Sequence, residues 1–188
     1  MTQLPTLENP MSGERVVFLE RASQTNGQLL RFEWFVRSVE PLPERAKRAP
    51  GHAHPAAEER IRVLAGKLWV RSGGVERTLT TGQEVVVPPR TPHAWWNVGT
   101  DEVSAIVEFR PAGRVESLFE TTFGMARNST KPGAFGTLLQ YAVVFHEFRD
   151  EISVLEVSER LGVSLLWPVG KLLGYRSDVP IAKVARQT

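Results

Sequence analysis

The sequence predicts a mainly β protein, with a β-barrel over residues 14–111 and a helical C-terminal extension over residues 112–188. Two observations carry this prediction. From Arg15 to about Arg110, short runs of Val, Ile, Phe and Trp alternate with Gly, Pro and Asn, as in closely spaced strands. After Pro111 the apolar residues recur every three or four positions, which is the helical period. A chain of 188 residues suits one domain with an appendage better than two full domains.

The first part of the chain divides into about eight expected strands, separated by turn signals such as Asn26-Gly27 and Ser72-Gly73-Gly74. Residues 1–13 are rich in Pro and polar residues, and we expect them to be loosely held. Many short strands at this spacing favour a sandwich or a barrel. The expected strands are Val16–Arg21, Leu29–Arg37, Ile61–Leu64, Lys67–Arg71, Arg77–Thr80, Glu84–Val87, Ala94–Val98 and Val103–Arg110.

Alternation along two of these strands predicts which side chains face the core, because successive strand residues point to opposite faces. Phe32, Trp34 and Val36 alternate with charged residues and are expected to point inward. The same pattern runs through residues 102–110, where Val103, Ala105, Val107 and Phe109 form the apolar set. Each strand thus has one buried and one wetter face, and a barrel fits this pattern.

Three helical segments are expected after the barrel. Apolar stripes run from Val115 to Ala126 and from Phe135 to His146, with Lys131-Pro132-Gly133 as the break between them. A third segment, Glu159 to Tyr175, is apolar around most of its circumference, and Pro168 is expected to kink it or to end its first part. His146 lies on its stripe, and we expect it in a core or an interface, away from the other histidines.

Composition excludes several classes of function. The formal net charge of +2 gives no basic patch for nucleic acid. The absence of Cys excludes disulfides, thiolate nucleophiles and Cys-bound zinc. The first residues lack the pattern of a signal peptide, so a cytoplasmic location is expected. The sequence also contains no phosphate loop, no nucleophile elbow and no dinucleotide fingerprint.

Two segments hold three of the four histidines. In the first, His52 and His54 are two residues apart and share a face of an extended chain. Glu58 and Glu59 compete for a carboxylate role beside them. Since Arg60 and Arg62 must face solvent, alternation places Glu59 inside the barrel. In the second segment, His93, Trp95 and Asn97 share a face, while Trp96 points the other way.

The two segments resemble the two signature motifs of the cupin superfamily. The first matches His-x-His-x(4)-Glu-x(6)-Gly from His52 to Gly66, and the second matches Gly-x(5)-Pro-x(4)-His-x(3)-Asn from Gly82 to Asn97. The resemblance implies a double-stranded β-helix, or jelly-roll, barrel. It further implies that one divalent metal is bound by His52, His54, Glu59 and His93. Two turn positions where the family has glycine are Ala46 and Arg90 here.

Three neutral imidazoles and one carboxylate suit a divalent transition metal such as Zn, Fe, Mn, Ni or Cu, and leave one or two positions open. The alternative is that these are core histidines with satisfied hydrogen bonds. Trp34 and Trp95 are expected to line a substrate cavity beside the metal, although inward aromatic side chains more often serve packing. Asn97 is expected either to bond a ligand or to satisfy strand backbone.

The expected function is a metal-dependent cupin that acts on or binds a small organic molecule, with oxygenase-type chemistry as the expected reaction. The alternative is a non-catalytic sensor or ligand-binding module. The apolar stripes of the extension need a partner, which we expect to be the barrel, one another or a second subunit in a homodimer. Contact of residues 159–175 with a membrane surface is a weaker expectation, and Gly170 and Gly174 suggest a close helix contact.

Overall fold

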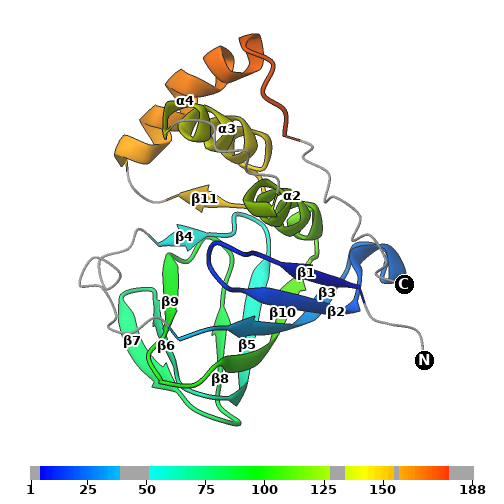
Figure 1. Ribbon diagram of the computed structural model, residues 1–188. Helices are drawn as coiled ribbons and strands as arrows, with labels where there is room; N and C mark the ends of the chain where they lie inside the picture. Colours follow the sequence, from blue (N-terminus) through cyan, green and yellow to red (C-terminus); the bar gives the residue numbers. More distant parts are fainter. Residues whose placement is uncertain (1–4, 39–50, 128–133, 155–156, 178–188) are drawn as a thin grey trace, which may run out of the picture.

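The computed structural model describes residues 5–38, 51–127, 134–154 and 157–177, and it confirms the mainly β fold (Figure 1). Two antiparallel sheets form the barrel, in the strand orders β1-β2-β3-β10-β5-β8 and β11-β4-β9-β6-β7. The sheet elements are β1 (Thr6–Glu8), β2 (Arg15–Glu20), β3 (Leu30–Val36), β4 (His52–Ala53), β5 (Glu58–Ala65), β6 (Leu68–Ser72), β7 (Val75–Leu79), β8 (Glu84–Val87), β9 (His93–Asn97), β10 (Val103–Arg110) and β11 (Ser153–Val154). The helices are η1 (Ala22–Gln24), α2 (Val115–Arg127), α3 (Ala134–Glu147) and α4 (Val157–Leu172).

The alternation predicted along the strands is confirmed. On β3, Phe32, Trp34 and Val36 are buried, and the residues between them are only partly buried. Strand β10 lies between β3 and β5, so that Val107 is opposite Phe32 on one side and Ile61 on the other. Inward residues of both sheets therefore meet in one apolar core.

The prediction that residues 1–13 are loosely held is wrong for Thr6–Glu8. This segment forms β1, which pairs antiparallel with β2, and its central residue Leu7 is buried. A turn from Asn9 to Glu14 then joins the two strands. The short strands β4 and β11 were also not predicted, because two residues are too few for a period to be recognised.

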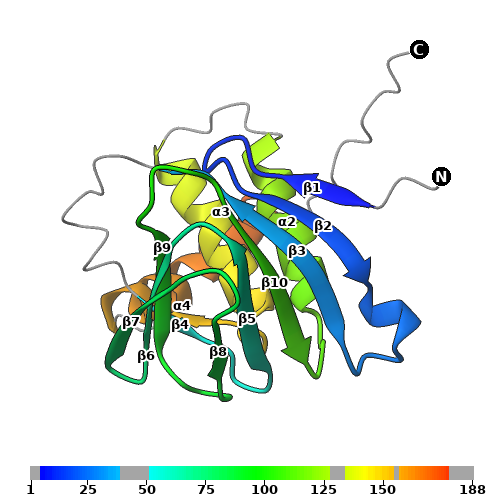
Figure 2. The ribbon, with the colours of Figure 1, turned by 90° about the horizontal axis from the view of Figure 1, so that it is seen from below.

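The helices cover one end of the barrel (Figures 1 and 2). Helix α2 packs directly on it, with Val115 and Phe123 in the barrel core. Arg21, which follows β2, forms ion pairs with Glu116 and Glu120 of this helix. Of the partners that the sequence left open for the apolar stripes, α2 thus uses the barrel.

Helices α3 and α4 pack mainly against each other. Gly170 lies so close to α3 that an added Cβ would be 3.2 Å from the Leu139 carbonyl oxygen, which accounts for a small residue there. Gly174 has no such neighbour and instead adopts a φ of +85° just after the end of α4. Pro168 does not end the helix, since α4 continues to Leu172.

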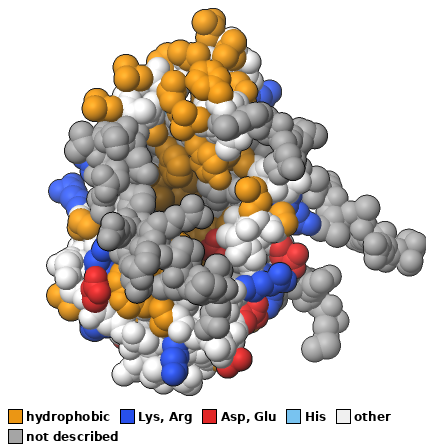
Figure 3. All heavy atoms as spheres, turned by 60° about the vertical axis from the view of Figure 1, so that its left-hand side comes forward, with side chains coloured by type: hydrophobic (Ala, Val, Ile, Leu, Met, Phe, Trp, Pro, Cys, Tyr) orange, Lys and Arg blue, Asp and Glu red, His pale blue; other side chains and the backbone are white. Residues whose placement is uncertain are grey.

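One face of this helix pair is apolar and exposed, and Figure 3 shows the hydrophobic side chains gathered there. In the described part of the chain, no helix has the length and apolar character needed to cross a membrane. The homodimer and the membrane-surface contact remain predictions. The exposed apolar residues of α3 and α4 are Phe135, Leu138, Tyr141, Leu161, Leu165, Val169 and Leu172.

Candidate metal centre

The four predicted ligands meet at one point inside the barrel. His52 lies on β4 and is paired in register with His93, the first residue of β9. His54 follows β4, and Glu59 points inward from β5. One nitrogen or oxygen atom from each side chain lies within 4.8 Å of the others. Two ligands on opposite sides of one ion are about 4.2 Å apart, so only a small closure would bring all four into range.

Hydrogen bonds from His54 and His93 to backbone carbonyls orient the free lone pair of each ring toward this point. Nδ1 of His54 lies 2.7 Å from the Glu151 carbonyl oxygen, and Nδ1 of His93 lies 2.9 Å from the Thr91 carbonyl oxygen. A carbonyl oxygen only accepts, so each Nδ1 must carry the proton and donate. In the neutral form of either ring, the free lone pair is therefore on Nε2, as in metal-bound histidines.

Three of the converging atoms are buried without a hydrogen-bond partner: Nε2 of His54, Nε2 of His93 and Oε2 of Glu59. His93 Nε2 lies 2.8 Å from Glu59 Oε2, an ion pair when His93 is protonated, and His54 Nε2 lies 3.6 Å from the same oxygen. Buried polar atoms without partners are costly in a core. Ligand atoms that converge on one carboxylate oxygen and have no other hydrogen-bond partner fit a shared ion, and this observation disfavours the alternative of satisfied core histidines.

The electrostatics of the group favour neutral imidazoles beside an ionised carboxylate. Burial, reinforced by His93, lowers the pKa of His52 to about 3, and burial also lowers the pKa of His54. Burial alone would raise the pKa of Glu59, but His93 and the other histidines outweigh it and hold this pKa at about 2. Burial opposes protonation of His93, yet Glu59 outweighs it and raises the pKa of His93. In the absence of metal, the proton of the group therefore belongs on His93.

The helical extension supports the segment that carries His52 and His54. Strand β11, which lies between α3 and α4 in the sequence, pairs with β4 so that Val154 is opposite His52. Glu151, just before β11, supplies the carbonyl oxygen that orients His54. Sequence reasoning missed Glu151, because no pattern links a backbone carbonyl to a histidine 97 residues away.

The barrel loops keep the shapes that the two motifs require. Gly66 has a φ of +85°, and an added Cβ would lie 3.0 Å from the Val103 backbone, so only glycine fits. Arg90, at a position where the cupin pattern has glycine, adopts a φ of +64° and donates its backbone N–H to the His54 carbonyl oxygen at 2.8 Å. Ala46 lies outside the described residues. The turn beside the metal group is thus preserved without the glycine.

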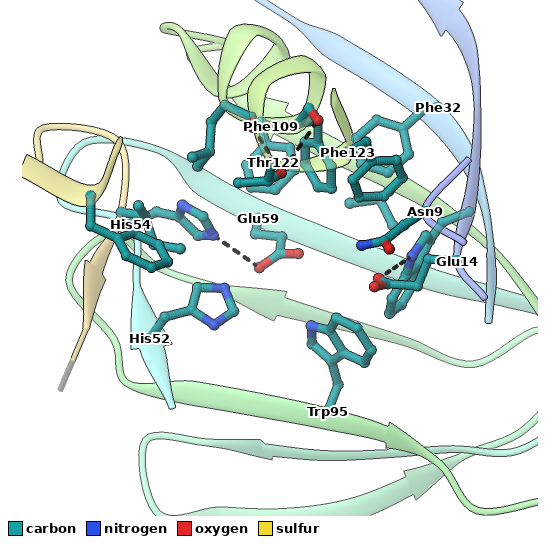
Figure 4. Close-up of a pocket in the computed structure, with 16 residues that line it drawn as sticks. Asn9, Glu14, Phe32, His52, His54, Glu59, Trp95, Phe109, Thr122 and Phe123 are labelled. Carbon is teal, nitrogen blue, oxygen red and sulfur yellow. Dashed lines mark hydrogen bonds and ion pairs between the residues drawn. The ribbon is translucent and has the colours of Figure 1, made fainter. Parts of the chain in front are cut away.

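A cavity of about 250 Å³ opens beside the metal group, and Figure 4 shows the side chains around it. Trp34 and Trp95 both line it, with ring centroids 4.1 Å apart. Asn97 does not. Its amide donates to the backbone carbonyls of Val36 and Asp101, and its oxygen accepts from Gly99 N–H. The full lining consists of Asn9, Glu14, Phe32, Trp34, His52, His54, Glu59, Trp95, Val107, Phe109, Leu118, Phe119, Thr122, Phe123, Phe145 and Ile152.

Sequence reasoning missed most of the cavity wall. The extension contributes Phe119 and Phe123 from α2 and Phe145 from α3, and the first hairpin contributes Asn9 and Glu14. A signal for the hairpin was present, since Leu7 stands between polar residues and Asn9 to Gly13 has the composition of a turn.

Comparison with known proteins finds a cupin-domain match over part of the chain and several similar structures. Residues 39–109 match the family model of the cupin domain. No curated protein matches the chain.

Among solved structures, an RmlC-like cupin from Shewanella frigidimarina is 21% identical, with a TM-score of 0.42, and the match covers 58% of this chain and 86% of that one. KdgF from Halomonas sp. is 20% identical, with a TM-score of 0.44 and coverage of 56% and 84%. A cupin-superfamily sugar phosphate isomerase from Silicibacter pomeroyi is 14% identical, with a TM-score of 0.45 and coverage of 57% and 71%.

Proposed function

Starting from a chain that carries a cupin domain, we propose that it is a metal-dependent protein that acts on a small organic molecule by oxygenase-type chemistry. One divalent transition metal would be held by His52, His54, Glu59 and His93. The observation that carries the proposal is the convergence of buried ligand atoms that lack hydrogen-bond partners. Nitrogen and oxygen donors of this kind suit Fe, Mn, Ni, Cu or Zn.

The chain itself orients the metal ligands, supplies a negative charge and surrounds the site with apolar side chains. The carbonyls of Glu151 and Thr91 hold two imidazoles with Nε2 facing inward. Glu59 supplies one negative charge, which offsets half of the charge of a divalent ion. When bound, the metal would supply Lewis acidity or redox chemistry at coordination positions that the protein leaves open. The aromatic wall, including Trp34 and Trp95, would hold an apolar substrate next to these positions and exclude water.

Metal titration of the purified, chelator-treated protein tests the site. We expect one equivalent of Zn²⁺ to bind, and we expect His52→Ala and Glu59→Gln each to weaken binding by more than roughly a hundredfold, since even residues behind the ligands contribute ten- to a hundredfold. His146→Ala is the matched control, because His146 stacks on Trp167 in the helical extension. Unchanged affinity in both ligand variants would refute the metal site.

A specific feature of the cavity favours the alternative of a non-catalytic binding module. Among the residues that line it, Glu14 is the one ionisable side chain other than the proposed ligands. The hydroxyl of Thr122 is already bonded to the Leu118 carbonyl of its own helix. Dioxygen consumption by the iron-loaded protein, supplied with small aromatic acids, separates the two functions. Substrate-dependent uptake that Glu59→Gln abolishes supports an oxygenase, and tight binding without uptake supports the module.

A further inference from the structure

The cavity has a second polar end, formed by Asn9 and Glu14 of the turn between β1 and β2. Figure 4 shows this pair on the side of the cavity away from His52 and His54, with Glu59 between. The Glu14 carboxylate accepts from Trp34 Nε1 at 3.1 Å and from the Ser12 hydroxyl at 2.6 Å. A carboxylate has about four acceptor sites, so two remain for a ligand. Burial raises the pKa of Glu14, despite the two hydrogen bonds that favour its ionised form.

Asn9 presents a donor beside this acceptor. Its Oδ1 accepts from the backbone N–H groups of Met11 and Ser12, at 3.0 and 3.2 Å. Both partners are donors, so the oxygen and the nitrogen of the amide are assigned without ambiguity. Among the described residues, Asn9 Nδ2 has no hydrogen-bond partner, and Figure 4 shows the amide facing the cavity. A backbone hydrogen bond from Asn9 N–H to the Glu14 carbonyl oxygen, 2.8 Å long, fixes the two residues relative to each other.

We infer that Asn9 and Glu14 recognise a hydroxyl group at the end of the ligand that is remote from the metal. A hydroxyl satisfies both residues at once, because its oxygen accepts from Asn9 Nδ2 and its proton goes to the Glu14 carboxylate. An ammonium group has no lone pair for Asn9, and a carboxylate would meet the charge of Glu14. Recognition of a hydroxyl by a carboxylate and an amide held in one turn is specific, because a ligand without the hydroxyl leaves Asn9 Nδ2 and the remaining acceptor sites of Glu14 without partners.

The wall between the two polar ends defines the body of the ligand. It is built of Phe32, Trp95, Phe109, Phe119 and Phe123, which present ring faces and edges to a small volume. A flat apolar body fits this wall. The ligand class is therefore a small aromatic molecule with a distal hydroxyl group, and we place a carboxylate at its other end as the group that would bind an open position of the proposed metal. The assignment of the carboxylate end rests on the proposed function, whereas the assignment of the hydroxyl end rests on Asn9 and Glu14.

Matched pairs of acids test this inference by calorimetry on the Zn²⁺-loaded protein. The pairs are benzoate and para-hydroxybenzoate, phenylacetate and para-hydroxyphenylacetate, and cinnamate and para-coumarate, so that ligand length is varied as well. In at least one pair we expect the hydroxylated acid to bind about ten- to a hundredfold more tightly, the range for a hydrogen bond to a charged group. Preference for the parent acid, or equal or undetectable binding in every pair, overturns the inference.

Two variants assign the preference to the turn. Glu14→Gln keeps an acceptor for Trp34 and should reduce the ratio of affinities within the pair to below about threefold, because a neutral hydrogen bond is weaker. Asn9→Asp keeps the oxygen that Met11 and Ser12 require and replaces the donor by an acceptor. Its added negative charge should weaken both acids of a pair, so the readout is the ratio within the pair, which should also fall. Glu8→Gln, on the exposed side of β1, is the control and should keep the wild-type ratio.

The outcomes separate this inference from the proposed function. If Glu14→Gln fails to fold, as judged by thermal unfolding, Asn9→Asp carries the test alone. A wild-type ratio in folded Glu14→Gln and Asn9→Asp overturns the inference but leaves the metal site standing. If Zn²⁺ does not bind, the same pairs are measured on the metal-free protein. If the ratio of affinities within a pair then still depends on Glu14, hydroxyl recognition is supported while the metal site fails. If the ratio does not depend on Glu14, both proposals are overturned.

Discussion

Helix α2 and the α3–α4 pair have similar apolar stripes in the sequence but relate to the barrel in different ways. Val115 and Phe123 of α2 are buried in the barrel core, and Arg21 ties the helix to β2 through Glu116 and Glu120. Helices α3 and α4 bury Leu139, Ala142 and Val143 and leave a broad apolar face exposed. A helical stripe in a sequence therefore predicts that a face will be covered, but it does not predict by what.

The segment between α3 and α4 shows a second difference, because it returns to the barrel at the metal group. Phe148 and Ile152 pack with Leu118 of α2. Strand β11 then pairs with β4, and Glu151 orients His54. Within the extension, α2, Phe145 near the C-terminal end of α3 and residues 148–154 thus belong to the site or support it, whereas no described residue of α4 lines the cavity.

The largest expected effect contrasts two phenylalanines. Phe123→Ala removes a buried ring of α2 from the barrel core and should lower the free energy of unfolding by about 3–5 kcal/mol. Phe135→Ala, on α3, removes a ring that is 61% exposed and should change it by no more than about 0.5 kcal/mol. Urea unfolding at one temperature measures both. Equal losses would show that α3 depends on the barrel as strongly as α2 does.

Substitutions at two glycines of α4 should change the stability by smaller amounts and in opposite directions. Gly170→Ala would place a Cβ 2.6 Å from Val143 Cγ2 and should destabilise the protein by about 1–2 kcal/mol, because Val143 is buried and cannot move aside. Gly162→Ala meets nothing within 4 Å and should stabilise it by up to about 1 kcal/mol through helix propensity.

The same unfolding assay checks the two glycine variants. Changes of opposite sign in the free energy of unfolding would confirm that α4 packs closely against α3 at Gly170 but not at Gly162. Destabilisation by Gly162→Ala would contradict the placement of this glycine on an open face of α4.

The barrel and its ligand positions were predictable because each rests on a local signal. Phe32, Trp34 and Val36 are inward through simple alternation, and Glu59 rather than Glu58 follows from the same period. His52, His54 and His93 are joined to Glu59 by motif spacing, which encodes the loops and strands that bring them together. The structure places all four side chains at one point.

The rest of the site depends on contacts between segments that are distant in the sequence, and the periodicity of the sequence does not reveal such contacts. Glu151 reaches His54 through a backbone carbonyl, and Phe145 reaches the cavity from α3. No pattern in the sequence singled out Glu14, although its pairing with Trp34 makes it part of the cavity wall. Each of these contacts is set by how the extension and the first hairpin pack on the barrel, which is a property of the whole fold.

The final prediction concerns the pH dependence of Zn²⁺ binding, to which the histidines of the barrel should contribute and the histidine of the extension should not. The pKa of His93 is raised because Glu59 outweighs burial, whereas burial lowers the pKa values of His52 and His54. A bound metal must displace the proton of His93, while the other two histidines have none to lose near neutral pH. Below the pKa of His93, the affinity for Zn²⁺ should therefore fall about tenfold for each unit of decrease in pH, or about 1.4 kcal/mol.

Calorimetry in buffers of different ionisation enthalpy measures this proton release directly, and about one proton per Zn²⁺ is expected below that pKa. His146→Gln is the matched control. His146 stacks on Trp167 at 4.0 Å, and burial, together with Arg149 and Lys171, lowers its pKa. It lies in the extension and should contribute nothing to the release. A release of two or three protons would mean that His52, His54 or both are charged in the metal-free protein, which would contradict the lowering of their pKa values by burial. A release that His146→Gln abolishes would show that the extension, and not the barrel, sets the pH response.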